Sequence, residues 1–161
     1  MTEGDRREAS TRTFLACAAE VARLLDLEAA ADVPEDRRAR HLARAVARPL
    51  LARASLPEEF FDPLMAAAVY DPDPSFCRWF VEPALYAFGR RRVLTALLAY
   101  FRTGAPAERA GARRAEYCAH LELRADRSPA YAPDGNRDPA LDEVEDVMDQ
   151  WLEASRAQER R

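Results

Sequence analysis

The chain has 161 residues, of which 48% are hydrophobic and 32% are charged, so its composition is that of a chain that folds around a core, not of a disordered one. All 24 basic residues are arginine, yet the formal net charge is −4 and the pI is about 5.3. An acidic balance of this kind disfavours a general nucleic-acid binder and leaves only a local arginine patch for that role.

No apolar run reaches the roughly 18 residues of a membrane span, and the charged start from Met1 to Glu8 lacks the apolar centre of a signal peptide. The three cysteines, Cys17, Cys77 and Cys118, are widely spaced, which is typical of small buried residues in a reduced compartment. We therefore expect a cytoplasmic protein without a membrane segment.

Two helices are predicted in the first third of the chain, after a polar segment over residues 1–10 that is expected to be flexible. The first runs from about Arg12 to Ala30, because apolar residues recur on one face at helical spacing. These are Phe14, Ala18, Val21, Ala22 and Leu25. The second begins near Pro34 and is ended or kinked by Pro49.

The second predicted helix carries an arginine stripe opposite its apolar face. The stripe consists of Arg37, Arg40, Arg44 and Arg48, together with His41. Such a stripe is by default a solvated helix face, but its guanidinium groups also suit a phosphate or a carboxylate-rich partner.

The stretch from Asp62 to Leu123 is predicted to form two helical hairpins in tandem. Ser55 to Glu58 has the form of a capping box, and Asp62 and Asp73 each precede a proline, as helix N-caps do. Helices are predicted over 63–70 and 74–88, the second with a kink at Pro83 and a left-handed cap at Gly89, and then over 91–102 and 106–124. The expected inner faces are Val93, Leu94, Leu97, Leu98 and Phe101 in the third, and Ala110, Tyr117, Cys118 and Leu121 in the fourth.

Residues 126–137 carry the prolines and glycine of a loop, and Asp138-Pro139 predicts the start of a last helix that ends near Arg156. Its expected inner face is Leu141, Val144, Met148, Trp151 and Leu152. No stretch alternates with the period of a strand. We therefore expect an all-α fold of about six to seven helices in a single domain over 11–156, with a frayed end over 157–161.

The two central hairpins match each other at a period of about 30 residues. Sliding 63–88 onto 93–118 aligns Leu64 with Leu94, Ala66 with Ala96, and Tyr70 with Tyr100. Asp73-Pro74 followed by Arg78, and Pro106 followed by Arg109, are similar to the turn of HEAT-like repeats, with one arginine a place late and Ala105 where an aspartate would stand.

Over about residues 62–123 the chain thus resembles HEAT-like, armadillo-type helical repeats. This resemblance implies an α-α superhelix of stacked antiparallel hairpins, whose terminal helices cap the array. It also implies a binding surface, usually for protein and sometimes for nucleic acid, and it carries over no catalytic residue.

Residues with chemical potential are few. Glu116 and His120 share a helix face, but a metal site needs two further ligands. The chain contains no nucleophile elbow, phosphate loop or dinucleotide fingerprint. Four acids, Asp62, Asp71, Asp73 and Glu82, surround one hairpin, where they serve either as helix caps or as an acid pair.

These patterns favour a non-enzymatic helical-repeat scaffold that binds another protein, as a monomer or weak homodimer and without a cofactor or metal. The expected binding residues are Arg78, Trp79, Arg90, Arg91, Arg92, Arg113 and Arg114. One alternative is a nucleic-acid-associated HEAT-like protein that holds phosphates with the same arginines. A second alternative is a small enzyme with an acid pair in the hairpin cleft.

Overall fold

The computed structural model describes residues 3–27, 33–53, 55–73, 75, 77–124 and 143–160. These ranges form seven α-helices and one 3-10 turn, and contain no strand: α1 (Glu3–Leu24), α2 (Glu35–Ala52), η1 (Glu58–Phe60), α3 (Phe61–Tyr70), α4 (Arg78–Phe88), α5 (Arg90–Thr103), α6 (Pro106–Cys118) and α8 (Glu145–Glu159). The all-α class is confirmed. The superhelical arrangement and the HEAT-like resemblance stay predictions.

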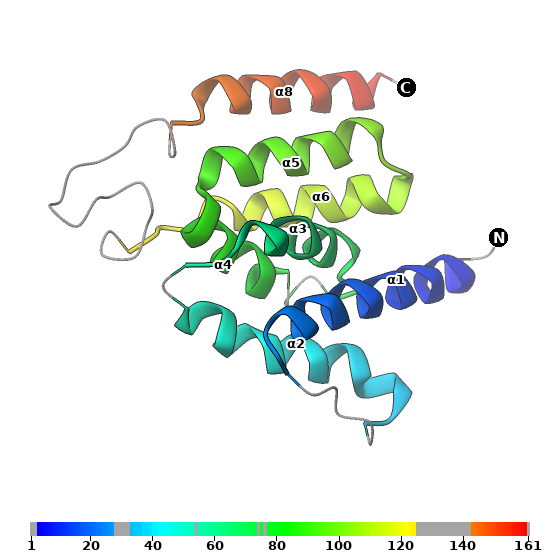
Figure 1. Ribbon diagram of the computed structural model, residues 1–161. Helices are drawn as coiled ribbons and strands as arrows, with labels where there is room; N and C mark the ends of the chain where they lie inside the picture. The colour runs from blue at the N-terminus through cyan, green and yellow to red at the C-terminus, as the bar shows by residue number, and fades with distance from the viewer. Residues whose placement is uncertain are drawn as a thin grey trace, which may run out of the picture.

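Helix α3 lies at the centre of the molecule and contacts α1, α4, α5, α6 and η1 (Figure 1). In this view α5, α6 and α8 lie above α3 and α4, and α1 and α2 lie below them. The buried side chains of α3 are apolar and point to several sides: Phe61, Leu64, Met65, Ala67, Ala68 and Val69. A helix that is apolar nearly all round must be enclosed by other elements, which explains its central place.

Helix α6 approaches α3 closely where the two helices cross. A Cβ atom placed on Gly111 of α6 would lie 2.8 Å from the carbonyl carbon of Val69 and closer still to the carbonyl oxygen. Ala112 and Ala115, both fully buried, continue this small-residue face of α6. Only glycine allows the two backbones to lie this close.

A polar contact fixes the start of α6 on the end of α3. The hydroxyl group of Tyr70 donates a hydrogen bond to the carboxylate of Glu108, whose other oxygen accepts from the backbone N–H of Ala105 at 2.5 Å. These bonds lower the pKa of Glu108 and raise that of Tyr70. Glu108 thus satisfies a donor at the helix N-terminus, since Ala105 has no capping side chain.

Helix α8 packs on α5 through Trp151. Its indole N–H donates a hydrogen bond of 3.2 Å to the carbonyl oxygen of Leu94, and its ring stacks on Phe101 with centroids 4.9 Å apart. Buried residues from every described helix form one core cluster. The expected apolar faces of the first predicted helix and of α5 are confirmed, since all five residues predicted for each are buried, although Leu25 lies just past the end of α1.

Several helix ends differ from the expected ones. α1 begins at Glu3, so residues 3–10 are helical where a flexible segment was expected. α2 continues past Pro49 to Ala52, because a proline so near the helix end removes a single hydrogen bond while Leu50 stays buried in the core. α6 ends at Cys118, short of residue 124.

The predicted aspartate N-caps are wrong. Asp62 lies inside the first turn of α3, where its charge suits the helix dipole, and it makes no capping hydrogen bond. α4 starts only at Arg78, with Cys77 at its N-cap, and Asp73 instead accepts a hydrogen bond of 2.9 Å from the N–H of Ser75 in the preceding turn. Gly89 does carry the expected positive φ, at 85°, and α4 continues through Pro83.

The predicted inner face of α6 is wrong for Ala110 and Tyr117, whereas Cys118 is partly buried and packs against the core. Tyr117 is 82% exposed and Ala110 is exposed, because the small face that includes Gly111 turns towards α3. In α8, Val147 and Trp151 are buried, whereas Leu152 is 53% exposed. The predicted loop over 126–137, the Asp138-Pro139 cap and Leu141 lie outside the described residues, and α8 as described begins at Glu145.

The close crossing predicts an unusual effect of Gly111→Ala. Helix propensity alone would make this change stabilising by about 1 kcal/mol. Here the added methyl group meets the Val69 backbone, so we expect the free energy of unfolding to fall by about 2–4 kcal/mol. Urea unfolding measures the free energy of unfolding of this variant. The control is Ala110→Gly at the exposed neighbouring position, whose free energy of unfolding should fall by at most about 1 kcal/mol. A more stable Gly111→Ala variant would show that the helices are not in close contact there.

Candidate functional site

The three successive arginines at the start of α5 each bind a different part of the chain. Arg90 donates hydrogen bonds to the carbonyl oxygens of Ala119 and Leu121, the bond to Leu121 having a length of 2.8 Å. Both carbonyls lie just after Cys118, the last residue of α6. These carbonyls have no partner within the helix, and a cation is favourable at the negative end of a helix dipole. Arg90 therefore closes α6, although its position at the start of α5 is unfavourable for α5 itself.

Arg91 and Arg92 reach the other segments that border α5. Arg91 donates two hydrogen bonds, of 2.8 and 2.6 Å, to the carboxylate of Asp146 and one of 2.8 Å to the carbonyl of Glu143, so it holds the start of α8. Hydrogen bonding to Arg91 lowers the pKa of Asp146. Arg92 pairs with Glu58 of η1 through two hydrogen bonds.

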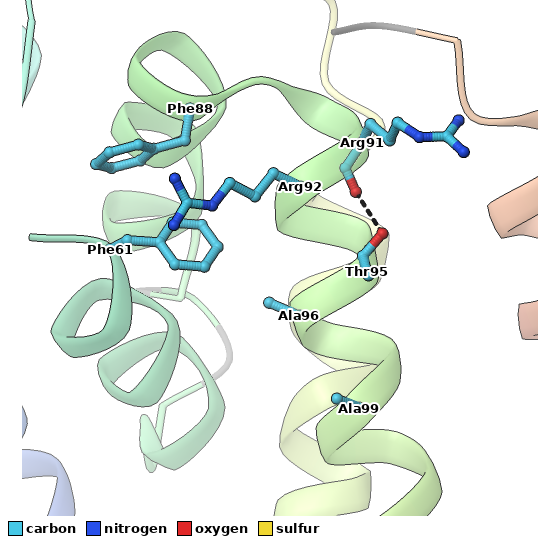
Figure 2. A pocket seen from close by; sticks show the side chains of 7 residues that line it. All are labelled: Phe61, Phe88, Arg91, Arg92, Thr95, Ala96 and Ala99. Atoms are coloured by element: carbon cyan, nitrogen blue, oxygen red, sulfur yellow. Dashed lines mark hydrogen bonds between the residues drawn. The ribbon is translucent and has the colours of Figure 1, made fainter. Parts of the chain in front are cut away.

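A groove of about 660 Å³ runs along α5 beside these arginines (Figure 2). The guanidinium of Arg92 lies between two aromatic rings, 4.0 Å from the ring centre of Phe61 and 5.3 Å from that of Phe88. Ala96 and Ala99 of α5 line the same groove. Both arginines of this groove already face a carboxylate of the chain, so its charge is largely balanced.

The other arginines expected to bind a partner also have contacts within the chain. Arg78 donates a hydrogen bond of 3.0 Å to Glu82, one turn further along α4, and Arg113 donates one of 2.8 Å to the hydroxyl of Ser155. Arg114 donates one of 3.1 Å to the carbonyl of Asp71. The partner-binding role of these residues stays a prediction. A partner that binds one of these guanidinium groups would compete with its hydrogen bond within the chain.

Trp79, the one aromatic residue among the expected binding residues, lies in a second groove. This groove has a volume of about 540 Å³ and lies between α2 and α4. Its lining residues from α2 are Arg44, Ala47, Arg48, Leu51 and Ala52. Trp79 is half-buried, so one part of the indole packs on the protein and the rest faces the groove.

The charge of this second groove is not balanced. Arg44 and Arg48 are exposed, and neither makes a hydrogen bond or an ion pair with any residue that the structure describes. They belong to the arginine stripe that the sequence placed on α2. Two cations beside an aromatic ring and a leucine form a surface suited to an acidic and partly apolar ligand.

A buried polar cluster lies where the turn before α4 meets α6. Asp71 is 1% exposed; one carboxylate oxygen accepts a hydrogen bond of 2.9 Å from the N–H of Asp73, and the other has no partner among the described residues. Burial raises the pKa of Asp71 to about 7, while the N–H of Ser75 lowers that of Asp73. The sulfur atoms of Cys77 and Cys118 lie 3.4 Å apart in the same region.

The remaining expectations concern metals and acids. His120 and Glu116 contact each other at 2.7 Å, and no group of three or more potential ligands occurs in the described part of the chain. The acids Asp62, Asp71, Asp73 and Glu82 line neither of the two grooves. Among the described helices, none combines the length and the apolar character needed to cross a membrane.

Comparison of the chain with family models, with curated proteins and with solved structures yields no match.

Sequence reasoning missed two arrangements. The first is the pairing of Trp79 with Arg44 and Arg48, which lie on helices far apart in the sequence. The second is the cluster around Asp71, which had been considered only as one acid among four. The sequence did contain a signal for the second, because Asp71 directly follows α3, the most apolar of the described helices, and is therefore easily buried.

The contacts of Arg90 and Arg91 predict different effects of the same substitution. Arg90→Ala leaves two carbonyls at the end of α6 without a partner and lowers the free energy of unfolding by about 2 kcal/mol. Arg91→Ala removes an ion pair with Asp146 and a hydrogen bond to the carbonyl of Glu143, both exposed to water, so stability is expected to change little. Urea unfolding of both variants tests this, and equal effects would contradict the assigned role of Arg90.

The raised pKa of Asp71 predicts a pH dependence of stability. The folded chain keeps this carboxyl protonated up to about pH 7, whereas the unfolded chain releases the proton near 3.8. The free energy of unfolding therefore falls as the pH rises between these values. Asp71→Asn retains the oxygen that accepts from Asp73 but cannot titrate, so we expect it to be more stable than the parent at pH 8 by about 2–4 kcal/mol.

Urea unfolding from pH 5 to pH 8 provides the measurement. The parent should lose stability across this range, and the Asp71→Asn variant should lose markedly less. Parallel curves for the two proteins would show that Asp71 is not the group responsible.

Proposed function

We propose that this chain is a non-enzymatic helical binding domain that docks an acidic amphipathic helix of a partner protein in the groove between α2 and α4. The observation that carries the proposal is the pair Arg44 and Arg48, which border Trp79 and have no acid to face within the described chain. The resemblance to HEAT-like repeats, which implies a protein-binding surface, supports the same class.

The spacing of the groove residues suits a helical ligand. Arg44 and Arg48 lie one turn apart on α2, which separates them by about 6 Å along the axis. Beside them, Ala47 and Leu51 form a second, apolar row that is only partly buried. A ligand helix with two acids one turn apart and a leucine between them places its carboxylates on the arginines and its leucine between Leu51 and Trp79.

The energetics favour this groove over the one along α5. In the α5 groove an acidic ligand must displace Glu58 from Arg92 and Asp146 from Arg91, so each new ion pair replaces an existing one. At Arg44 and Arg48 no such exchange is required. Tryptophan and arginine are also the residues that most often dominate binding energy at protein interfaces.

Binding of a synthetic helical peptide tests the proposal. The probe is a fluorescein-labelled peptide in which one leucine is flanked by glutamates a turn apart, and its control carries glutamine in place of glutamate. For the parent protein we expect a dissociation constant on the order of 10–100 μM for the acidic peptide and at least about tenfold weaker binding of the control.

Protein variants distinguish binding in the groove from a general effect of the net charge of the protein. The double change Arg44→Glu with Arg48→Glu should weaken binding at least about tenfold, and Trp79→Ala should do the same. The matched control is Arg156→Glu with Arg160→Glu, a pair of exposed arginines with the same spacing at the end of α8. It changes the net charge equally and should leave binding within about twofold.

Two results would overturn the proposal. One is equal loss of binding in the groove variant and in the α8 control, which would mean that net charge alone attracts the peptide. The other is binding of a single-stranded oligonucleotide through Arg44 and Arg48 with no binding of the acidic peptide. That outcome, with a steep dependence on salt, would establish the nucleic-acid alternative instead.

A further inference from the structure

Two thiols from different helices lie in contact inside the molecule. Cys77, which is 1% exposed, occupies the N-cap position of α4, and Cys118, which is half-buried, is the last residue of α6. Their sulfur atoms are 3.4 Å apart. A disulfide bond has a length of about 2.05 Å, so the two sulfur atoms must move closer by about 1.4 Å to form one.

We propose that Cys77 and Cys118 form a reversible oxidation site, at which thiol–disulfide exchange with a low-molecular-weight disulfide links the start of α4 to the end of α6. This inference is independent of the groove between α2 and α4. The sequence favoured three packed, reduced cysteines, and the structure now distinguishes a contacting pair from Cys17 on α1.

Exposure sets the order of the two steps. Cys118 is the thiol that an external reagent can reach, so its thiolate attacks one sulfur of the small disulfide. A bond forms between Cys118 and that sulfur, the S–S bond of the reagent breaks, and one small thiolate leaves. Burial and the hydrogen bond with Cys118 raise the pKa of Cys77 to about 12, so Cys77 remains protonated and does not react first.

The second step closes the bond within the protein. Once Cys118 is held in the mixed disulfide, Cys77 gives up its proton to the solvent and its thiolate attacks the sulfur of Cys118; the mixed disulfide breaks, and the second small thiolate leaves. The two protons given up by the cysteines pass to the two departing thiolates. In total the protein thiols lose two electrons and the external disulfide becomes two thiols, and an external dithiol reverses the reaction.

The link is expected to stabilise the folded chain. It joins positions 41 residues apart in sequence, so it restricts the unfolded chain strongly, while the folded chain already holds the two sulfurs together. We therefore expect the oxidised protein to unfold at a temperature higher by on the order of 10 °C. Reduction should restore the original midpoint.

The test treats the full chain with oxidised glutathione at pH 8, stops the reaction, and then alkylates the remaining thiols. Intact mass should fall by about 2 Da before alkylation, and peptide mapping should connect Cys77 with Cys118. Cys17→Ser should behave like the parent. Cys77→Ser should accumulate glutathione on Cys118, whereas Cys118→Ser should stay unmodified at Cys77, because the remaining thiol is buried.

Each other outcome overturns the inference. A disulfide that includes Cys17, or no disulfide at any glutathione concentration, would show that the contacting pair is not an oxidation site. Glutathione on Cys77 in the Cys118→Ser variant would contradict the order of steps. Thermal unfolding of the oxidised Cys17→Ser protein, with and without dithiothreitol, checks the expected stabilisation independently of mass.

Discussion

The contact of Gly111 with the backbone of Val69 brings α6 and α3 closer than side chains normally permit. Other parts of the molecule depend on this crossing. α5 joins α6 through a short turn at Gly104 and Ala105, and α8 packs on α5 in turn. Cys118 lies about two turns after Gly111 along α6, so the same crossing brings it to the turn that carries Asp71 and Cys77.

Arginine serves two different purposes in this chain. Arg90 saturates the carbonyls at the end of α6, and Arg92 spans η1, α3 and α4 through Glu58, Phe61 and Phe88. Such contacts use the planar, multiply donating guanidinium as a connector between elements. Arg44 and Arg48 make no comparable contact with the residues that the structure describes, and their arrangement favours an external ligand.

The sequence predicted the helices whose apolar faces are made of large residues. All five residues expected on the face of the first helix, and all five of α5, are buried, because phenylalanine, valine and leucine recur on these faces at helical spacing. The inner face of α6 was predicted wrongly, because it consists of Gly111, Ala112 and Ala115, whereas the large residue Tyr117 faces solvent. A search for large apolar residues at helical spacing does not detect a helix face made of glycine and alanine, which lets two helix backbones lie close together.

The candidate site was predicted only in part. Trp79 and the arginine stripe of α2 were both noted, but their meeting in one groove depends on the packing of α2 against α4, which local spacing does not contain. Arg90, Arg91 and Arg92 are expected from the sequence to bind a partner, because a run of like charges does not reveal that each member reaches a different segment of the chain. Contacts between residues distant in sequence decided both points.

Side-chain NMR of the arginine Nε–H groups tests this division of roles most directly. The account predicts slow hydrogen exchange and high order for Arg90 and Arg92, and fast exchange and low order for Arg44 and Arg48 in the protein without a partner. Equal order in all four guanidinium groups would contradict it, because Arg44 and Arg48 would then be held within the fold.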